Sequence, residues 1–192
     1  AYPAGCQQGT SCTMVLGGQH LKEVSEAYVW GEGVQVEILD WYRPLTRGMY
    51  MQLRNSLRDA RQKLIERGSK SPSPEEVAAE AGVSERQLRE IEVYRQRDQD
   101  PKRQPNEQLE EELTVKVTVA ADAKPGKHEL RLVTETAMSN PLWLHVDTWA
   151  EMRETEPNDT QPQEFSGQLP IVINGQIMPG DRDSFSFAAR KG

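Results

Sequence analysis

The sequence predicts a mainly β protein: a β-sandwich with an inserted helical segment, followed by part of a second β module. Apolar and polar residues alternate between Leu113 and Val146 with the two-residue period of strands that have one buried face. At Arg43-Pro44 the period changes to about 3.6 residues, which is typical of a helix. Short alternating runs return at residues 169–177 and 184–188, near the end of the chain.

Three successive strands are expected between residues 113 and 146. Their apolar positions alternate with polar ones and are Leu113, Val115, Val117, Val119, Leu130, Leu132, Leu142, Leu144 and Val146. The Pro125-Gly126 pair and the turn at Ser139-Asn140-Pro141 separate the three runs. We expect an antiparallel meander with one buried and one exposed face, and a second sheet must cover the buried face.

Residues 1–42 are expected to supply that second sheet. Residues 24–30 and 34–39 flank Gly31-Glu32-Gly33, a pattern typical of a β-hairpin. The second of these runs alternates apolar with polar residues, so one of its faces is expected in the core through Val34, Val36 and Ile38. Residues 1–42 and 113–148 are therefore predicted to form one sandwich.

Residues 43–112 are expected to form a helical insertion between two strands of the sandwich. Apolar residues with helical spacing predict one long helix that Gly68 ends: Met49, Leu53, Leu57, Leu64 and Ile65. Ser73 before Pro74 predicts the start of a second, short helix that ends at Gly82, and Ser84 starts a third. Because loop closure costs little extra entropy as a loop lengthens, such an insertion can leave and re-enter a sandwich edge.

Residues 149–192 are predicted to be a linker and part of a second β module. The stretch 147–163 is acidic and rich in turn-forming residues, which indicates a spacer. Two short strands do not stand alone in water, and their unpaired edges favour association with another chain. We expect a neighbouring chain or a missing segment to cover them, with docking on the sandwich itself as the alternative.

The charge of the chain is unevenly distributed. The net charge is −7, yet residues 43–103 carry 14 Lys and Arg against 10 Asp and Glu, which leaves −11 on the remainder. An acidic chain is a poor nonspecific ligand for nucleic acid. The mean hydropathy of −0.74 predicts solvated helix, linker or exposed tail, and no apolar run approaches the roughly 18 residues that span a bilayer.

The two cysteines, Cys6 and Cys12, enclose five residues. We expect an intramolecular disulfide between them if the protein is exported, and two reduced thiols otherwise. Their spacing matches no common metal motif.

Residues 1–42 and 113–146 carry one family resemblance. The phrases YPAGCQQGT, VLGGQHL, WGEGVQVEIL and DAKPGKHELRLVT, the last at residues 122–134, resemble an immunoglobulin-like module of the IPT/TIG type from exported proteins of planctomycete-like bacteria. The resemblance implies an immunoglobulin-like β-sandwich that acts as a spacer or as a protein- or glycan-contact surface. The sequence departs from the pattern at Cys6, where such modules often have glycine.

A second resemblance covers residues 154–189. ETEPNDTQPQ and LPIVINGQIMPGDRDSFSFAA resemble the opening of a bacterial pre-peptidase C-terminal domain, a β-sandwich appended to secreted hydrolases. The match covers about half of such a domain, which implies a fragment of a longer protein. Five oxygen donors of the kind that calcium prefers gather here: Glu156, Asn158, Asp159, Asp181 and Asp183. The other interpretation is a solvated turn, in which Asp and Asn side chains bond to their own backbone.

The stretch EEVAAEAGVSERQLREI has the layout of a helix-turn-helix and is similar to the third region of bacterial sigma factors. If it bound DNA, Glu85, Arg86, Gln87 and Arg89 would face the major groove. A two-helix packing unit has the same steric needs, and we favour it because the local excess of positive charge is small. The basic side chains Arg54, Arg58, Arg61, Arg86 and Arg89 then form a surface for an acidic protein partner or for acidic parts of the same polypeptide.

The histidines His20, His128 and His145 do not combine with a nucleophile into a recognisable catalytic pattern, so we expect no enzyme. The sequence favours a secreted, periplasmic or cell-surface module of a larger protein that spaces domains or binds a protein or glycan. The alternative is a helix-turn-helix DNA-binding protein that uses residues 45–97.

Overall fold

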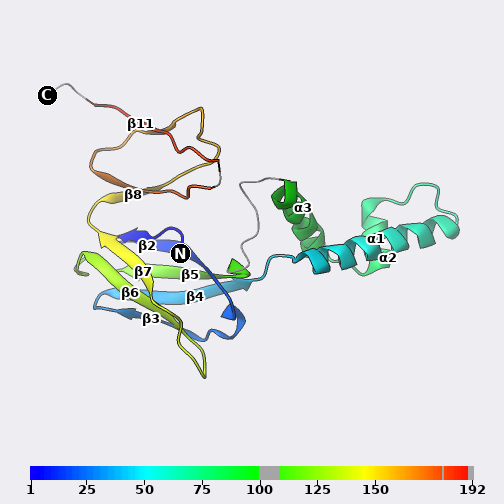
Figure 1. The fold of residues 1–192 in the computed structure, drawn as a ribbon, viewed down its shortest axis with the longest axis horizontal. Helices are drawn as coiled ribbons and strands as arrows, with labels where there is room; N and C mark the ends of the chain where they lie inside the picture. Colours follow the sequence, from blue (N-terminus) through cyan, green and yellow to red (C-terminus); the bar gives the residue numbers. More distant parts are fainter. Residues whose placement is uncertain (100–108, 179, 190–192) are drawn as a thin grey trace. The chain divides into compact units, whose positions relative to one another are not determined.

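The computed structural model describes residues 1–99, 109–178 and 180–189 (Figure 1). Among these residues strands predominate, arranged in several sheets, and three α-helices lie between the fourth and fifth strands. The chain divides into two compact units, one formed by Ala1–Tyr42 with Asn106–Gly192 and the other by Arg43–Pro105. We call them the β unit and the helical unit.

A three-stranded sheet has β5 (Glu111–Val119) at its centre. β2 (Ser11–Gly18) and β4 (Val34–Tyr42) pair with β5 on either side, both antiparallel. The inward side chains of β5 are only 0–2% exposed: Leu113, Val115, Val117 and Val119. The alternation that predicts one buried face on this strand is therefore confirmed.

A four-stranded sheet has the order β1-β7-β6-β3. β6 (Gly126–Val133) pairs antiparallel with β7 (Leu142–Asp147) and with β3 (Glu26–Trp30), while β1 (Gly5–Gln7) runs parallel to β7. The inward side chains of this sheet and of β5 belong to one hydrophobic cluster, which includes Leu130, Leu132, Leu144 and Val146. Burying each such side chain stabilises the fold by roughly 1.5–3 kcal/mol.

Two predicted strand pairings are wrong. β3 pairs with β6 and β4 pairs with β5, so the Gly31–Gly33 turn joins two different sheets and makes no hairpin. β5 and β6 also lie in different sheets, so residues 113–146 form no meander. The Gly31–Gly33 turn and the loop after Val119 pack together. Ala120 N–H donates to Gly33 O at 2.7 Å, and a Cβ on Gly33 would lie 2.8 Å from the Cβ of Ala123.

Glu111 is a buried carboxylate at the start of β5. Its Oε2 accepts hydrogen bonds from Leu21 N at 2.6 Å, Lys22 N at 3.1 Å and Trp41 Nε1 at 3.1 Å. The two backbone N–H groups belong to a short 3₁₀ turn, Leu21–Glu23, and the indole belongs to β4. Glu111 therefore links β5 both to this turn and to β4. This carboxylate satisfies the buried N–H of Leu21 and two part-buried donors.

The C-terminal part of the β unit contains two small parallel pairs. β8 (Ala150–Arg153) pairs with β10 (Ile171–Asn174), and β9 (Gln163–Phe165) pairs with β11 (Phe185–Phe187). The predicted spacer at residues 147–163 thus contains strand structure, because its backbone finds partners about 20 residues further along the chain.

Hydrogen bonds join these strands to the first residues of the chain. Asn174 Oδ1 accepts from Ala4 N at 3.1 Å, Asn174 O accepts from Tyr2 Oη at 3.2 Å, and Arg153 donates to Thr13 O. These contacts agree with the alternative expectation, in which the C-terminal strands dock on strands of the same chain. Association with another chain stays a prediction, and large apolar side chains of this part remain exposed, among them Leu169, Ile177 and Phe187.

The helical unit contains α1 (Arg47–Glu66), α2 (Pro74–Ala81) and α3 (Glu85–Gln99). Leu45, Ile91 and Tyr94 are buried together, and the Tyr50 and Tyr94 rings stack with centroids 4.3 Å apart. Leu53 and Leu57 pack against this cluster, whereas Met49 and Ile65 of the predicted stripe are exposed. The predicted start of α2 is confirmed: Ser73 is its N-cap and forms a capping box with Glu76. None of the described helices is long and apolar enough to cross a membrane.

The helical unit should be dispensable for the β unit. Tyr42 and Glu112 lie opposite each other in the β4–β5 ladder, so the helical unit connects the ends of two adjacent strands. We expect that replacing residues 45–104 with a short flexible linker leaves the β unit folded. Its free energy of unfolding should rise by about 1–2 kcal/mol, because closing a shorter loop costs less entropy. Circular dichroism and urea unfolding measure this. An unfolded product would show that the helices are part of the β unit's core.

Glu111→Ala should destabilise the β unit by about 2–3 kcal/mol, because it leaves the buried Leu21 N–H without an acceptor and removes the partner of two part-buried donors, Lys22 N–H and the Trp41 indole N–H. Glu37→Ala is the matched control, since Glu37 is exposed on β4 of the same sheet. The difference is measured by chemical denaturation. Equal stability of the two variants would contradict this role for Glu111.

Candidate functional site

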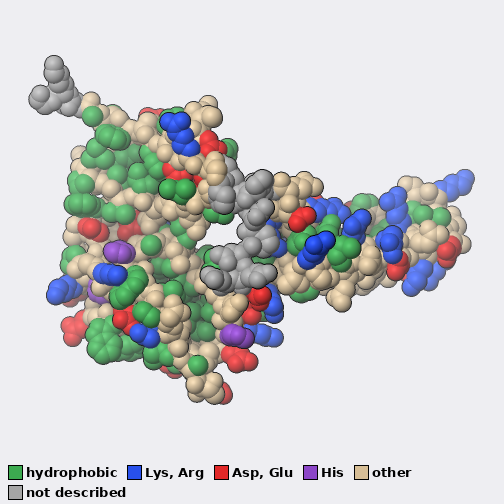
Figure 2. Space-filling view, in the orientation of Figure 1, with side chains coloured by type: hydrophobic (Ala, Val, Ile, Leu, Met, Phe, Trp, Pro, Cys, Tyr) green, Lys and Arg blue, Asp and Glu red, His purple; other side chains and the backbone are tan. Residues whose placement is uncertain are grey.

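The outer face of the four-stranded sheet carries exposed aromatic side chains. Tyr28 and Trp30 on β3 are 53% and 73% exposed, and Trp143 on β7 is 43% exposed. They point away from the core because they alternate with inward residues of the same strands, such as Leu144. Figure 2 shows hydrophobic side chains beside charged and histidine side chains over this part of the β unit.

The strand register places these rings in rows across the sheet. Trp30 is paired with Glu129, and Glu129 is paired with Trp143, so the two tryptophans flank one carboxylate. In the next row Tyr28 is paired with Arg131. The rings of Tyr28 and Trp30 meet edge to face, with centroids 6.1 Å apart and planes at 70°.

Charged side chains lie between and over the rings and are held in place. Arg131 forms an ion pair with Glu129 and donates from Nη1 to Ser139 O at 3.0 Å. The Lys127 ammonium lies 3.6 Å from the centroid of the Trp143 ring, which is within the range of a cation–π contact. We call the surface of Tyr28, Trp30, Lys127, Glu129, Arg131 and Trp143 the aromatic face.

An open pocket of about 600 Å³ adjoins the aromatic face, and Trp30 and Lys127 belong to both. Its walls are the Gly31–Gly33 turn and the loop from Asp122 to His128. His128 is buried there, with Nε2 2.7 Å from Lys124 O, so its ring holds the loop. Sequence reasoning missed this site, although the aromatic residues at alternate, outward positions of residues 26–30 are a signal that could have indicated it.

An acidic cluster lies in the C-terminal part of the β unit. Ligand oxygens of Glu154, Glu156 and Asp183 lie within 4.8 Å of one another. Glu154 Oε2 and Asp183 Oδ1 are buried and have no hydrogen-bond partner. Burial raises the pKa of the Glu154 carboxyl above its ordinary value, and the nearby charges of Asp183, Glu156 and Asp181 raise it further.

The structure separates the five predicted calcium ligands into two pairs and a single residue. Glu156 and Asp183 belong to the acidic cluster, which also includes Glu154, a residue that sequence reasoning missed. Asp159 and Asp181 instead accept hydrogen bonds from the Arg182 backbone N–H, each at 3.0 Å. Asn158 is buried, and its Oδ1 accepts from Ser184 N at 3.4 Å. The clustered carboxylates could hold a hard divalent cation, because three oxygens converge there.

Cys6 and Cys12 are free thiols in the structure, which differs from the predicted disulfide. Cys6 is buried on β1 and Cys12 is half-buried on β2. The two thiols contact each other: their hydrogen bond lowers the pKa of Cys6 and, together with burial, raises that of Cys12. A disulfide therefore stays a prediction for the oxidised protein.

The predicted basic surface of the helical unit is largely paired with acidic side chains. Arg58 contacts Asp59 at 3.3 Å, Arg86 contacts Glu90 at 3.2 Å, and Arg89 contacts Glu85 at 3.7 Å. Arg54 and Arg61 are exposed. Figure 2 shows basic side chains spread along this unit among acidic and hydrophobic ones. Exposed ion pairs of this kind add little stability. Because each arginine is neutralised by its acidic partner, these pairs add no net positive charge to the surface of the helical unit.

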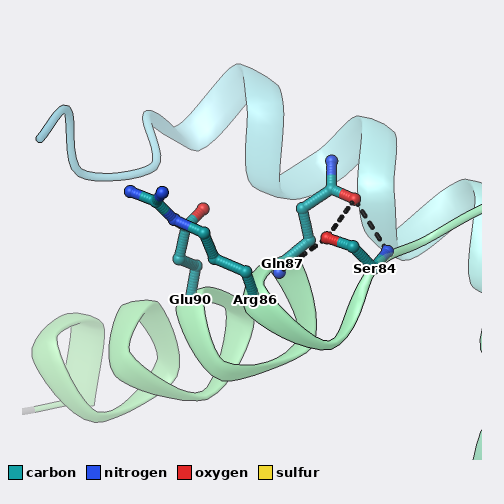
Figure 3. A network of polar contacts seen from close by, with 4 residues as sticks. All are labelled: Ser84, Arg86, Gln87 and Glu90. Atoms are coloured by element: carbon teal, nitrogen blue, oxygen red, sulfur yellow. Dashed lines mark hydrogen bonds and ion pairs between the residues drawn. The ribbon is translucent and has the colours of Figure 1, made fainter.

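The helix-turn-helix segment uses its polar side chains to cap α3. Gly82 adopts the left-handed conformation with φ 65°, and α3 begins after Ser84. Gln87 Oε1 accepts from Ser84 N at 2.9 Å and Gln87 N donates to Ser84 Oγ at 3.3 Å (Figure 3). Gln87 and Arg86, two of the four residues expected to face DNA, are thus engaged within the helix.

Comparisons of the chain with protein-family models, with curated proteins and with solved structures gave no significant match.

The acidic cluster should make stability depend on pH and on Glu154. A raised pKa in the folded state means that stability is lost as the pH rises through that pKa, because the folded protein then loses a proton it binds more tightly than the unfolded chain does. We expect Glu154→Gln to raise the unfolding temperature at pH 7 and to have no effect below about pH 4, where the unfolded carboxyl is also protonated. Thermal melts across this range measure it.

Adding calcium distinguishes between the two interpretations of the acidic cluster, a cation site and a solvated turn. If the cluster binds the ion, millimolar calcium chloride should raise the unfolding temperature of the wild-type chain at pH 7 but not that of Glu154→Gln. Glu164→Gln, on exposed β9, is the control and should respond as the wild type does. An equal response to calcium in all three proteins would exclude specific binding at the cluster.

Proposed function

We propose that the chain is a non-enzymatic binding and spacing module of a larger secreted, periplasmic or cell-surface protein, and that it contacts a protein or a glycan through the aromatic face. The observation that carries this proposal is the presence of three exposed aromatic rings on one sheet face. Single exposed apolar residues are common, but a group of large ones marks an interaction site. Aromatic and arginine side chains also supply much of the binding energy at interfaces.

The proposed architecture is an immunoglobulin-like β-sandwich with an inserted helical unit, followed by part of a pre-peptidase C-terminal-like module. It is supported by the single hydrophobic cluster to which both sheets contribute and by the position of the helical unit between the adjacent ends of β4 and β5. The resemblances at residues 122–134 and 154–189 support the same assignment and an extracytoplasmic location.

A binding role agrees with the state of the polar groups around the aromatic face. Glu129 is paired with Arg131, and the His128 ring is bonded to the Lys124 carbonyl. Groups held by such partners are already oriented before a ligand binds, which lowers the entropic cost of binding. The proposal therefore assigns them a positioning role.

DNA binding through residues 45–97 is the alternative function. It is less well supported, because Gln87 caps its own helix and Arg86 and Arg89 are paired with glutamates. Specific readout would require these side chains to give up their present contacts and reach base edges.

The proposed function is tested by sedimentation of the full chain with bacterial cell-envelope material. We expect wild-type protein to bind, and we expect a Tyr28→Ala/Trp30→Ala/Trp143→Ala variant to lose at least about tenfold in affinity, since these rings would be the anchors of the interface. Trp149→Ala is the matched control: Trp149 is 48% exposed, close to the value for Trp143, and lies past the end of β7.

A gel-shift assay with duplex DNA at low salt accompanies this measurement. Micromolar DNA binding with a steep salt dependence would favour the alternative function. Envelope binding that the triple substitution leaves unchanged would contradict the role of the aromatic face.

A further inference from the structure

The spacing of the rings on the aromatic face suits an extended chain of sugar rings. Trp30 and Trp143 are each one strand away from Glu129 in the same row, so their backbones are about 10 Å apart. This distance is comparable to the length of a disaccharide repeat in an extended polysaccharide. Sugar rings two positions apart along such a chain can cover the two indole rings while the chain crosses β3, β6 and β7, once the Lys127 ammonium moves off the Trp143 ring.

The chemistry between the rings suits hydroxyl groups. A pyranose ring has an apolar C–H face and a rim of hydroxyls that both donate and accept hydrogen bonds. An aromatic ring covers the apolar face, and the rim needs fixed polar partners beside it. Glu129 lies between Trp30 and Trp143, and Arg131 lies beside Tyr28. Both side chains are 34% exposed and are held by their ion pair and by the Ser139 carbonyl.

A protein partner fits this arrangement less well. The centre of a protein–protein interface is depleted of acidic residues although it is enriched in arginine, whereas here the carboxylate of Glu129 lies between the two tryptophans. Covering the ion pair of Glu129 and Arg131 with apolar side chains would remove its hydration without replacing it. Sugar hydroxyls replace the lost water with hydrogen bonds, so a glycan avoids that cost.

The charges indicate that the ligand is neutral. The aromatic face and the adjoining pocket together contain three basic and three acidic side chains: Lys124, Lys127, Arg131, Glu32, Asp122 and Glu129. A polyanion would require an excess of positive charge, which this balanced surface lacks. The open pocket of about 600 Å³ shares Trp30 with the face and is large enough for a further sugar unit.

From these observations we infer that the aromatic face binds a neutral, extended polysaccharide, with sugar rings over Trp30 and Trp143 and hydroxyls on Glu129 and Arg131. The next sugar unit occupies the pocket beside the Gly31–Gly33 turn. This inference rests on the proposed binding function and names its ligand class.

The test has two arms, both with the full chain. In the first, affinity gel electrophoresis is run with neutral soluble polysaccharides, namely hydroxyethylcellulose, mixed-linkage β-glucan, xylan and glucomannan, and with anionic polygalacturonate. We expect retardation by at least one neutral polymer, a loss of about tenfold or more in affinity for Trp30→Ala and for Trp143→Ala, and no change for Trp149→Ala. Circular dichroism confirms that each variant is folded.

In the second arm, the envelope material of the sedimentation assay is treated before use. Periodate oxidation, which cleaves vicinal diols, should abolish the binding, and protease digestion should leave it intact. This arm supports a glycan ligand even if its sugar is not among the soluble polymers of the first arm.

The outcomes separate this inference from the proposed function. Envelope binding that depends on the aromatic face but is lost on protease digestion and survives periodate would identify a protein partner, which overturns the glycan inference and leaves the binding function standing. Retardation by polygalacturonate alone, with a steep salt dependence, would overturn the neutral ligand. Envelope binding that is insensitive to the aromatic substitutions would overturn both.

Discussion

The burial of one face of β5 is the constraint on which the rest of the β unit depends. Its four inward side chains, Leu113 to Val119, are almost completely removed from water. Because successive side chains of a strand point in opposite directions, this burial determines which face of β2 and β4 also turns inward. The four-stranded sheet completes the cluster from its own inner face, and its outer face is therefore free to carry the aromatic residues.

The two connections between the sheets determine how that outer face is composed. At the Gly31–Gly33 turn and in the loop after Val119 the chain passes from one sheet to the other, and the two connections contact each other through Gly33 and Ala123. Gly33 has φ 82°, which favours glycine, and has no room for a Cβ. The passage places β3 beside β6, which brings Tyr28 and Trp30 next to Arg131 and Glu129.

Charged side chains on α3 and on the aromatic face are paired with near neighbours, and this shapes what each of these two surfaces offers. Arg86 and Arg89 of α3 are paired one turn away with Glu90 and Glu85, which reduces the attraction of that helix for polyanions. On the aromatic face the same kind of pairing, between Glu129 and Arg131, fixes two groups between exposed rings. The acidic cluster differs, because Glu154 and Asp183 each have a buried oxygen without a hydrogen-bond partner.

Local features could be predicted from the sequence: the two-residue period of β5, β6 and β7, the caps at Ser73 and Ser84, and the end of α2 at Gly82. These depend on residues within a turn or a strand of one another. Only the tertiary structure decided that β3 pairs with β6, that β8 pairs with β10 in parallel, and that Glu154 joins Glu156 and Asp183. The physical reason is that a period of two specifies which face of a strand is buried but not its neighbour, and a site on a sheet face is built from neighbours.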